Sequence, residues 1–153
     1  MRERGGNMRV TLTGDKQLLK NLASFGKAAD KYVADVVNGT AQNIRTNAIK
    51  SIQRGPKSGT VYDKSNPTRT HQASAPGQPP ASDTGRLANS ITAEIDGKQA
   101  TITAGTEYAA PLEFGTRTIE PRPFMVPAME NERPKFEKRL QKIVDAGTKG
   151  LLK

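Results

Sequence analysis

Ser90-Ile91-Thr92-Ala93-Glu94-Ile95-Asp96-Gly97-Lys98-Gln99-Ala100-Thr101-Ile102-Thr103-Ala104-Gly105 is the stretch that decides the fold. Apolar and polar residues alternate on both sides of Asp96-Gly97, a dipeptide favoured in the two-residue turns of β-hairpins. Such a turn predicts three cross-strand pairs: Ile95 with Lys98, Ala93 with Ala100, and Ile91 with Ile102. Because this register puts the apolar residues of both strands on one face, turn chemistry and hydrophobic pattern agree on a hairpin.

The N-terminal third of the chain supplies a helix that could cover this hairpin. Mostly apolar residues recur there at steps of three or four, the period of an amphipathic helix: Leu18, Leu22, Phe25, Ala29, Val33, Val36, Thr40, Ile44, Ala48 and Ile52. We predict one long helix over residues 15–53, either continuous or broken near Gly26, capped by Asp15 and ended by Gly55-Pro56. Residues 8–13 alternate between apolar and polar and predict a half-buried strand before it.

The segment from residue 55 to residue 83 has no periodic pattern and holds half of the ten prolines of the chain. We interpret it as an extended Pro/Gly-rich loop. We expect it to be mobile in a free subunit and to become ordered when neighbouring subunits contact it. Asp83-Thr84 then predicts a cap for a short helical turn at residues 85–87. Residues 107–114 predict a further strand, confined by Pro111 to an edge or a bulge.

Pro127 suits the first turn of a helix, which we predict over residues 127–149 with a kink or delay at Pro134. Its apolar stripe would be Met129, Phe136, Leu140, Ile143 and Val144. The expected fold is therefore α+β: a small, mostly antiparallel sheet packed against one long N-terminal helix, with a C-terminal helix and the long loop. We expect a single domain over residues 1–153, with residues 1–7 as an N-terminal arm.

Composition narrows the class of function. There is no Cys and only one His, His71, and no carboxylate cluster has metal-ligand spacing, so we predict no catalytic, cofactor-binding or metal site. No apolar run approaches the roughly 18 residues that a membrane span needs, so we expect no membrane contact. The formal net charge of +9 favours a polyanionic neighbour, although a solvated basic surface would look the same.

Positive charge gathers in the C-terminal helix, where Lys135, Lys138, Arg139 and Lys142 are candidates to face DNA. Aromatic residues that could stack on bases are sparse there, so backbone-type electrostatic contact fits better than sequence readout. One function class open at this point is a basic nucleic-acid-binding accessory protein in DNA packaging or recombination.

Two runs of sequence together resemble a known family. They are Ser74-Ala75-Pro76-Gly77-Gln78-Pro79-Pro80-Ala81-Ser82-Asp83-Thr84-Gly85-Arg86-Leu87-Ala88-Asn89-Ser90-Ile91, and Tyr108-Ala109-Ala110-Pro111-Leu112-Glu113-Phe114-Gly115-Thr116 followed by Arg122-Pro123-Phe124-Met125 and Pro127-Ala128. In this order they resemble the neck, or tail-completion, family of tailed bacteriophages, typified by gene product ten of a lambdoid siphophage. The resemblance spans about residues 8–145, and the Arg/Gly-rich start at residues 2–6 has no counterpart in it.

The resemblance implies a non-enzymatic structural protein of the virion, assembled in the host cytoplasm and placed in the neck. It implies a ring-forming subunit, six-fold or twelve-fold, that connects the capsid connector to tail-terminator or tail-tube proteins. The genomic DNA would pass through its lumen, where contact would be non-specific.

The second run also holds the candidate interface residues: Glu113, Phe114, Gly115, Thr116, Arg122 and Phe124. Phe114 and Phe124 lie beside Gly/Pro-stiffened turns in an aromatic-poor chain, so either could anchor a subunit contact or simply belong to the core. Glu113 and Arg122 could pair across a subunit boundary or within one subunit.

Overall fold

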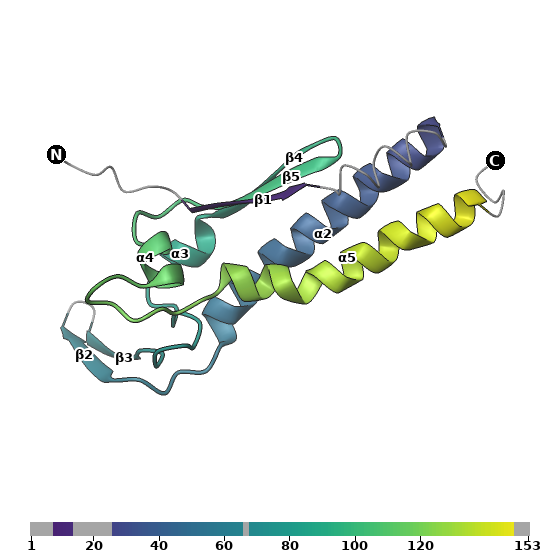
Figure 1. Cartoon of the computed structure of the whole chain (residues 1–153). Coiled ribbons are helices and arrows are strands. Elements are labelled where there is room, and N and C mark those ends of the chain that lie inside the picture. The colour runs from purple at the N-terminus through teal and green to yellow at the C-terminus, as the bar shows by residue number, and fades with distance from the viewer. Residues whose placement is uncertain (1–7, 14–25, 66–67, 149–153) are drawn as a thin grey trace.

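The computed structural model describes residues 8–13, 26–65 and 68–148 (Figure 1). Its elements in chain order are β1 (Met8–Thr13), α2 (Lys27–Arg54), β2 (Val61–Ser65), β3 (Thr68–Gln72), α3 (Arg86–Asn89), β4 (Ile91–Asp96), β5 (Gln99–Ala104), α4 (Ala109–Phe114) and α5 (Met125–Thr148).

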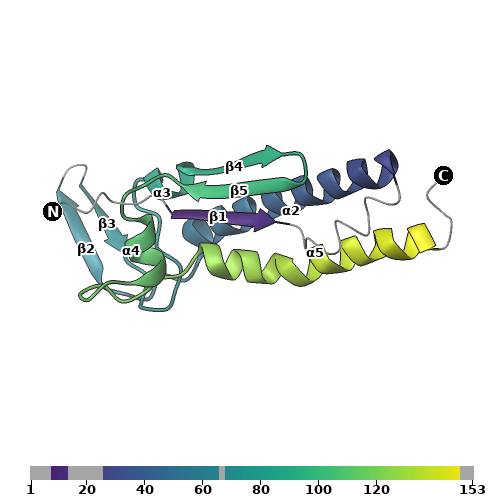
Figure 2. The same ribbon diagram turned by 45° about the horizontal axis from the view of Figure 1, so that its top comes forward.

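Helix α2 organises the molecule. An antiparallel sheet of order β1-β5-β4 lies on one side of α2, and α5 runs along it, as Figures 1 and 2 both show. This arrangement confirms the predicted α+β fold, the strand over residues 8–13 and the long N-terminal helix, which ends at Arg54. Gly26 has a φ of 84° and precedes the helix, which begins at Lys27. The predicted part before residue 26 lies outside the described residues.

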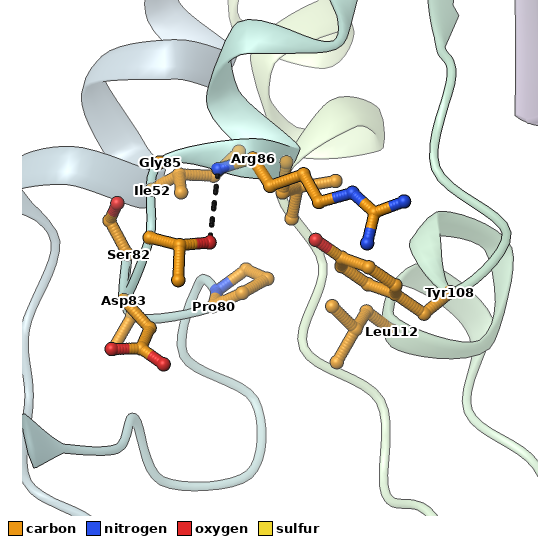
Figure 3. Close-up of a pocket in the computed structure, with 11 residues that line it drawn as sticks. Ile52, Pro80, Ser82, Asp83, Gly85, Arg86, Tyr108 and Leu112 are labelled. Carbon is orange, nitrogen blue, oxygen red and sulfur yellow. Dashed lines mark hydrogen bonds between the residues drawn. The ribbon is translucent and has the colours of Figure 1, made fainter. Parts of the chain in front are cut away.

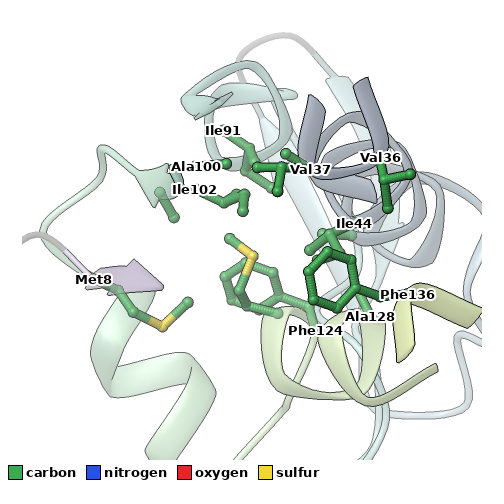
Figure 4. Close-up of a cluster of buried hydrophobic side chains, with 14 of the residues drawn as sticks. Met8, Val36, Val37, Ile44, Ile91, Ala100, Ile102, Phe124, Ala128 and Phe136 are labelled. Atoms are coloured by element: carbon green, nitrogen blue, oxygen red, sulfur yellow. The ribbon is translucent and has the colours of Figure 1, made fainter. Parts of the chain in front are cut away.

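The core forms where α2, the sheet and α5 meet (Figure 4). Every predicted apolar position of α2 from Ala29 to Ile52 is buried, and so are Phe136, Leu140 and Ile143 of the α5 stripe. Each fully buried Val, Ile, Leu or Phe side chain contributes roughly 1.5–3 kcal/mol relative to an exposed one. Burial of these mostly aliphatic side chains explains how a chain with only 5% aromatic residues can pack two helices and a sheet around one core.

The β4–β5 hairpin is present, but its register differs from the predicted one. Ile91 pairs with Ala104 and Ile95 with Ala100, two residues further along β5 than expected. The turn residues are Gly97 and Lys98, and Gly97 has a φ of 56°. Glycine with positive φ at the first central position is typical of a type II′ turn. A shift of two residues keeps each side chain on its face, so the apolar residues share one face as predicted, although that face is exposed at Ile95 beside the turn.

The strand predicted over residues 107–114 is wrong, because the structure has helix α4 there. Pro111 falls in the first turn of α4, where the N–H group that proline lacks has no partner within the helix. Gly115 ends the helix, with its N–H donating to the carbonyl of Pro111 at 2.9 Å. Pro111, which disfavours a strand here, is therefore compatible with a short helix that Gly115 ends.

The loop predicted over residues 55–83 is only partly irregular, since it contains the antiparallel hairpin β2–β3. Both faces of this hairpin are largely exposed. Its sequence therefore carries no alternation between buried and exposed positions from which a strand could be predicted.

Asp83 holds this hairpin to the rest of the molecule. Lys64 and Arg69 form salt bridges with its carboxylate, and His71 Nδ1 lies 3.8 Å from it. The hydrogen bond from Lys64 lowers the pKa of Asp83, and the charge of Arg69 acts in the same direction against partial burial. Asp83 is therefore not the predicted cap of α3; Thr84 Oγ1 accepts a hydrogen bond from Arg86 N at 3.4 Å instead.

We expect Asp83→Asn to free the β2–β3 hairpin without unfolding the core. The neutral amide removes the negative charge that holds Lys64 and Arg69, and β2 and β3 pack mainly against each other. Limited trypsin digestion should then cut at Lys64 and Arg69 severalfold faster than in the wild type, because cleavage follows the population of the open form. Asp63→Asn on the exposed part of β2 is the matched control, and equal cleavage rates in all three proteins would contradict the role of Asp83.

A buried carboxylate also joins the two long helices. Glu132 of α5 accepts hydrogen bonds from Asn43 (3.2 Å) and Asn47 (3.3 Å) of α2 and from Lys135 (2.6 Å), and only 2% of the residue is exposed. Burial alone would raise the pKa of Glu132, but the hydrogen bonds from Lys135 and Asn43 and nearby positive charge outweigh it, so the pKa is lowered.

A lowered pKa makes this network sensitive to acid. The contribution of this network to folding stability is complete at pH values above 4.5, the ordinary pKa of Glu132. It is lost as the pH falls through the lower pKa that Glu132 has in the folded protein. We expect Glu132→Gln to lower the free energy of unfolding at pH 7 by about 1.5–3 kcal/mol, the scale of hydrogen bonds to a charged group. The deficit should shrink in urea titrations below about pH 4. A deficit that is constant with pH would contradict the role of the charge, and Glu137→Gln on the exposed side of α5 is the control.

Candidate assembly surface

Exposed large apolar side chains gather at one end of the molecule. Of the seven such residues in the described part of the chain, five lie in or beside the β2–β3 hairpin and α4: Val61, Tyr62, Tyr108, Phe114 and Ile119. Figures 1 and 2 place these elements together, far from the start of α2 and the end of α5. A cluster of exposed apolar side chains indicates an interaction surface more often than single exposed apolar residues do.

Glu113 is the buried polar centre of this end. Its carboxylate accepts three hydrogen bonds from backbone N–H groups, those of Phe124 (2.8 Å), Met125 (3.0 Å) and Val126 (2.8 Å). These are donors of the first turn of α5, which a helix leaves without internal partners, and the negative charge also complements the helix dipole. The cap explains why α5 begins at Met125, two residues before the predicted start, and it fixes α4 against α5.

The two phenylalanines predicted as anchors have different environments. Phe124 is 1% exposed and belongs to the core, so its assignment as a surface anchor is corrected. Phe114, at the end of α4, is 66% exposed, the most exposed large apolar residue in the described part of the chain. The difference arises because Phe124 enters α5 beneath the Glu113 cap, whereas Phe114 lies at the C-terminal end of a short helix.

The residues after Phe114 form a rigid turn. The Thr116 N–H donates to the Ile119 carbonyl at 2.7 Å, and Thr116 Oγ1 accepts from the N–H groups of Thr118 (3.2 Å) and Ile119 (3.1 Å). Gly115 has a φ of 76°, and a Cβ there would lie 2.8 Å from the Ile119 carbonyl oxygen, so only glycine fits. We call residues 114–120 the tip; it is exposed apart from Gly115, yet its backbone is held in place.

Arg122 closes the base of the tip. Its N–H donates to the Leu112 carbonyl at 2.6 Å, and its Nε donates to the Ser74 carbonyl at 3.4 Å. Of the two alternatives for Glu113 and Arg122, pairing within one subunit is absent from the described residues, because Glu113 is occupied by the α5 cap. Arg122 instead ties the tip to the loop before α3.

The four basic candidates on α5 do not have equal freedom. Lys135 pairs with Glu132, and the guanidinium of Arg139 lies against α2, where a Cβ on Gly39 would be 3.9 Å from it. Lys138 and Lys142 are exposed and form no salt bridge among the described residues. They lie four residues apart, so they share one face of the helix.

A cavity of about 250 Å³ opens beside α4 (Figure 3). Ile52, Pro80, Leu87 and Leu112 supply apolar walls, and the side chains of Arg86 and Tyr108 lie beside each other along one side of it. Arg86 is exposed and has no salt bridge among the residues the structure describes. Neither Arg86 nor Ile119 is predicted as a site residue from the sequence, although Ile119 is the one large apolar residue in a polar segment over residues 115–120.

Other kinds of site are not apparent in the described ranges. Residues 8–13, 26–65 and 68–148 hold no group of three or more His, Asp or Glu side chains placed to bind a metal ion. Over the same ranges, no helix combines the length and the hydropathy required to span a membrane.

Comparison with protein-family models identifies the family of the chain. Residues 16–115, about two thirds of the chain, match the family model described as "Bacteriophage HK97-gp10, putative tail-component". The matched range includes α2, the Asp83 region, the β4–β5 hairpin and α4 with Glu113 and Phe114. No curated protein and no solved structure matched the chain. The chain belongs to the HK97 gp10-like family, and it is a structural component of a bacteriophage tail and hence of the virion.

Proposed function

We propose that this tail component is a ring-forming subunit at the head–tail joint, where it connects the capsid connector to tail-terminator or tail-tube proteins. The observation that carries the proposal is the tip: Phe114 is 66% exposed on a backbone that is already hydrogen-bonded and turned by Gly115. A rigid, aromatic-bearing segment loses little conformational entropy when it docks, which favours tight association between subunits.

A cyclic homo-oligomer, six-fold or twelve-fold, is the arrangement we propose for these subunits. Each copy would then present its tip and its α5 once around the axis. Repetition multiplies one weak contact into a closed ring, and it multiplies the positive charge of α5 in the same way.

Loss of the gene tests the place in the virion. If the protein joins heads to tails, phage that lack it should accumulate DNA-filled heads and separate, normal tails in electron micrographs. Joined particles in normal numbers would contradict a role at the joint. Tails that fail to polymerise would place the protein elsewhere in the tail.

A basic lumen gives a second expectation. If Lys138 and Lys142 face the genome, their double replacement by Glu should leave the subunit folded and ring formation intact while DNA retention falls. The change spares Lys135 and Arg139, which contact Glu132 and α2. DNA protected from nuclease in assembled particles is the measurement, with Lys31→Glu/Lys50→Glu on exposed positions of α2 as the control. Wild-type DNA retention would mean that these lysines are a solvated surface only.

The second candidate is a nucleic-acid-binding accessory protein in packaging or recombination, favoured by the net charge of +9 and by the exposed Lys138 and Lys142 of α5. Such a protein should bind short duplexes alone, with affinity that falls steeply with salt because counterions are released. A neck subunit should bind them weakly. A salt-titrated binding assay on the purified chain separates the two functions.

A further inference from the structure

We propose that the tip of one subunit docks into the Arg86 cavity of the next copy of this chain, with Ile119 in the apolar part and Glu120 paired with Arg86. The inference deepens the proposed function and rests on it, because it names the two surfaces that would join neighbours in the ring.

The receiving surface combines an apolar wall with a polar wall of Ser82, Asp83 and Thr84, and it has a cation at its edge. Ile52, Pro80, Leu87 and Leu112 line the cavity, and Arg86 stands beside Tyr108, which is 40% exposed (Figure 3). Arg86 N is held by Thr84 Oγ1 at 3.4 Å, but its guanidinium has no carboxylate partner in the described part of the chain. A cavity with this lining fits an apolar side chain that is followed by a carboxylate.

The tip offers that combination. Ile119 is 38% exposed, and Glu120 is exposed and forms no salt bridge among the described residues. The Thr116 hydrogen bonds to residues 118 and 119 hold Ile119 in place before any partner arrives. Two complementary groups, one apolar and one charged, are therefore present in the right order on a preorganised turn.

The two surfaces are different parts of the subunit, which decides the kind of assembly. A contact between unlike patches that two subunits do not return to each other is head-to-tail, and such contacts close into a ring when the rotation per subunit divides a full turn. Glu120 and Arg86 both lack an ion-pair partner within the described residues. This charge complementarity selects a second copy of the chain as the occupant.

Charge exchange is the first test. Arg86→Glu alone and Glu120→Arg alone each place like charges opposite one another, so each should weaken self-association of the full chain by roughly tenfold or more. The double variant Arg86→Glu/Glu120→Arg restores the pair with reversed polarity and should recover most of the association. Arg9→Glu and Glu94→Arg, on exposed strand positions, are the matched controls, and sedimentation velocity with circular dichroism measures assembly and folding.

Cysteine pairing is the second test. Because the chain contains no cysteine, every disulfide that forms must join introduced residues. One chain carries only Ile119→Cys and the other only Tyr108→Cys, so a mixed disulfide under mild oxidation can form only between subunits. We expect this heterodimer in good yield, and little when Tyr32→Cys, an exposed position on α2, replaces Ile119→Cys. A chain with both cysteines should then give a ladder that extends beyond the dimer.

The outcomes separate the inference from the proposed function. The docking proposal would be wrong, and the ring proposal would stand, if two results were found together. Both single charge-reversal variants would form rings as well as the wild type does, and no mixed disulfide would form between the Ile119→Cys and Tyr108→Cys chains. A wild-type chain that stays monomeric at every concentration, with no disulfide between the two cysteine variants, would overturn both. A ladder that stops at the dimer would overturn the head-to-tail arrangement, because it indicates reciprocal pairing of two subunits.

Discussion

Replacement of Phe124 by alanine is expected to lower the free energy of unfolding of the isolated subunit by about 3–5 kcal/mol, the usual cost of removing a buried phenylalanine. Phe124 is 1% exposed and is among the largest fully buried side chains, in the core cluster that Figure 4 shows. Its N–H also donates to Glu113, so movement of the backbone to fill the space would disturb the cap of α5.

Urea unfolding of the purified monomer measures this loss. Small domains have a total stability of only about 5–15 kcal/mol, so the variant should unfold at much lower denaturant concentration. Phe114→Ala, the same change at an exposed position on the neighbouring helix, should alter stability by no more than about 0.5 kcal/mol. If the Phe124 variant kept wild-type stability, the side chain would not belong to the core.

Phe114→Ala is expected to have its large effect on assembly. An exposed aromatic residue on a rigid segment is typical of an interface hot spot, where truncation costs at least about 2 kcal/mol of binding free energy. That loss corresponds to an association constant reduced by roughly thirtyfold per contact, since about 1.4 kcal/mol is a factor of ten. Over a ring the deficits accumulate, so closed rings should be nearly absent.

Sedimentation velocity over a range of concentrations measures this effect, together with the melting temperature of the same samples. Tyr32→Ala removes an exposed aromatic ring of α2 away from the tip and serves as the control. Unchanged assembly of the Phe114 variant would exclude the tip as a subunit contact. A large drop in melting temperature would instead indicate that Phe114 supports the fold.

Periodic patterns predict the parts of the fold that bury one face. The stripe from Ala29 to Ile52 and the alternation in β5 are confirmed as buried faces, whereas in β4 only Ile91 is buried and Ile95 is 39% exposed. The predicted register of the hairpin differs by two residues from the observed one. Asp96-Gly97 and Gly97-Lys98 are both acceptable turns, and the same face results from either.

Elements without a buried face leave no such pattern. The β2–β3 hairpin is exposed on both sides and is held by Asp83, a residue that lies more than ten positions further along the chain. Helix α4 differs from the predicted strand because Pro111, which is disfavoured in central strands and in helix interiors, is tolerated in the first turn of a helix.

The sequence predicts the site as a region but not the roles within it. Residues 113–124 do include the exposed tip, yet which phenylalanine is buried depends on the Glu113 cap, eleven residues away from Phe124. A tertiary contact of this kind leaves no period in the sequence. Arg86 and Glu120 become candidates only in the folded chain, because only there can their lack of an ion-pair partner among the described residues be seen.

Electron micrographs of the purified wild-type protein, scored for closed rings, test the central claim that this tail component is a ring-forming subunit. We expect rings of one uniform stoichiometry, six-fold or twelve-fold, in the wild type, and folded particles without rings for Phe114→Ala. Wild-type particles that remain single subunits at every concentration, or rings that form equally well without the Phe114 side chain, would contradict it.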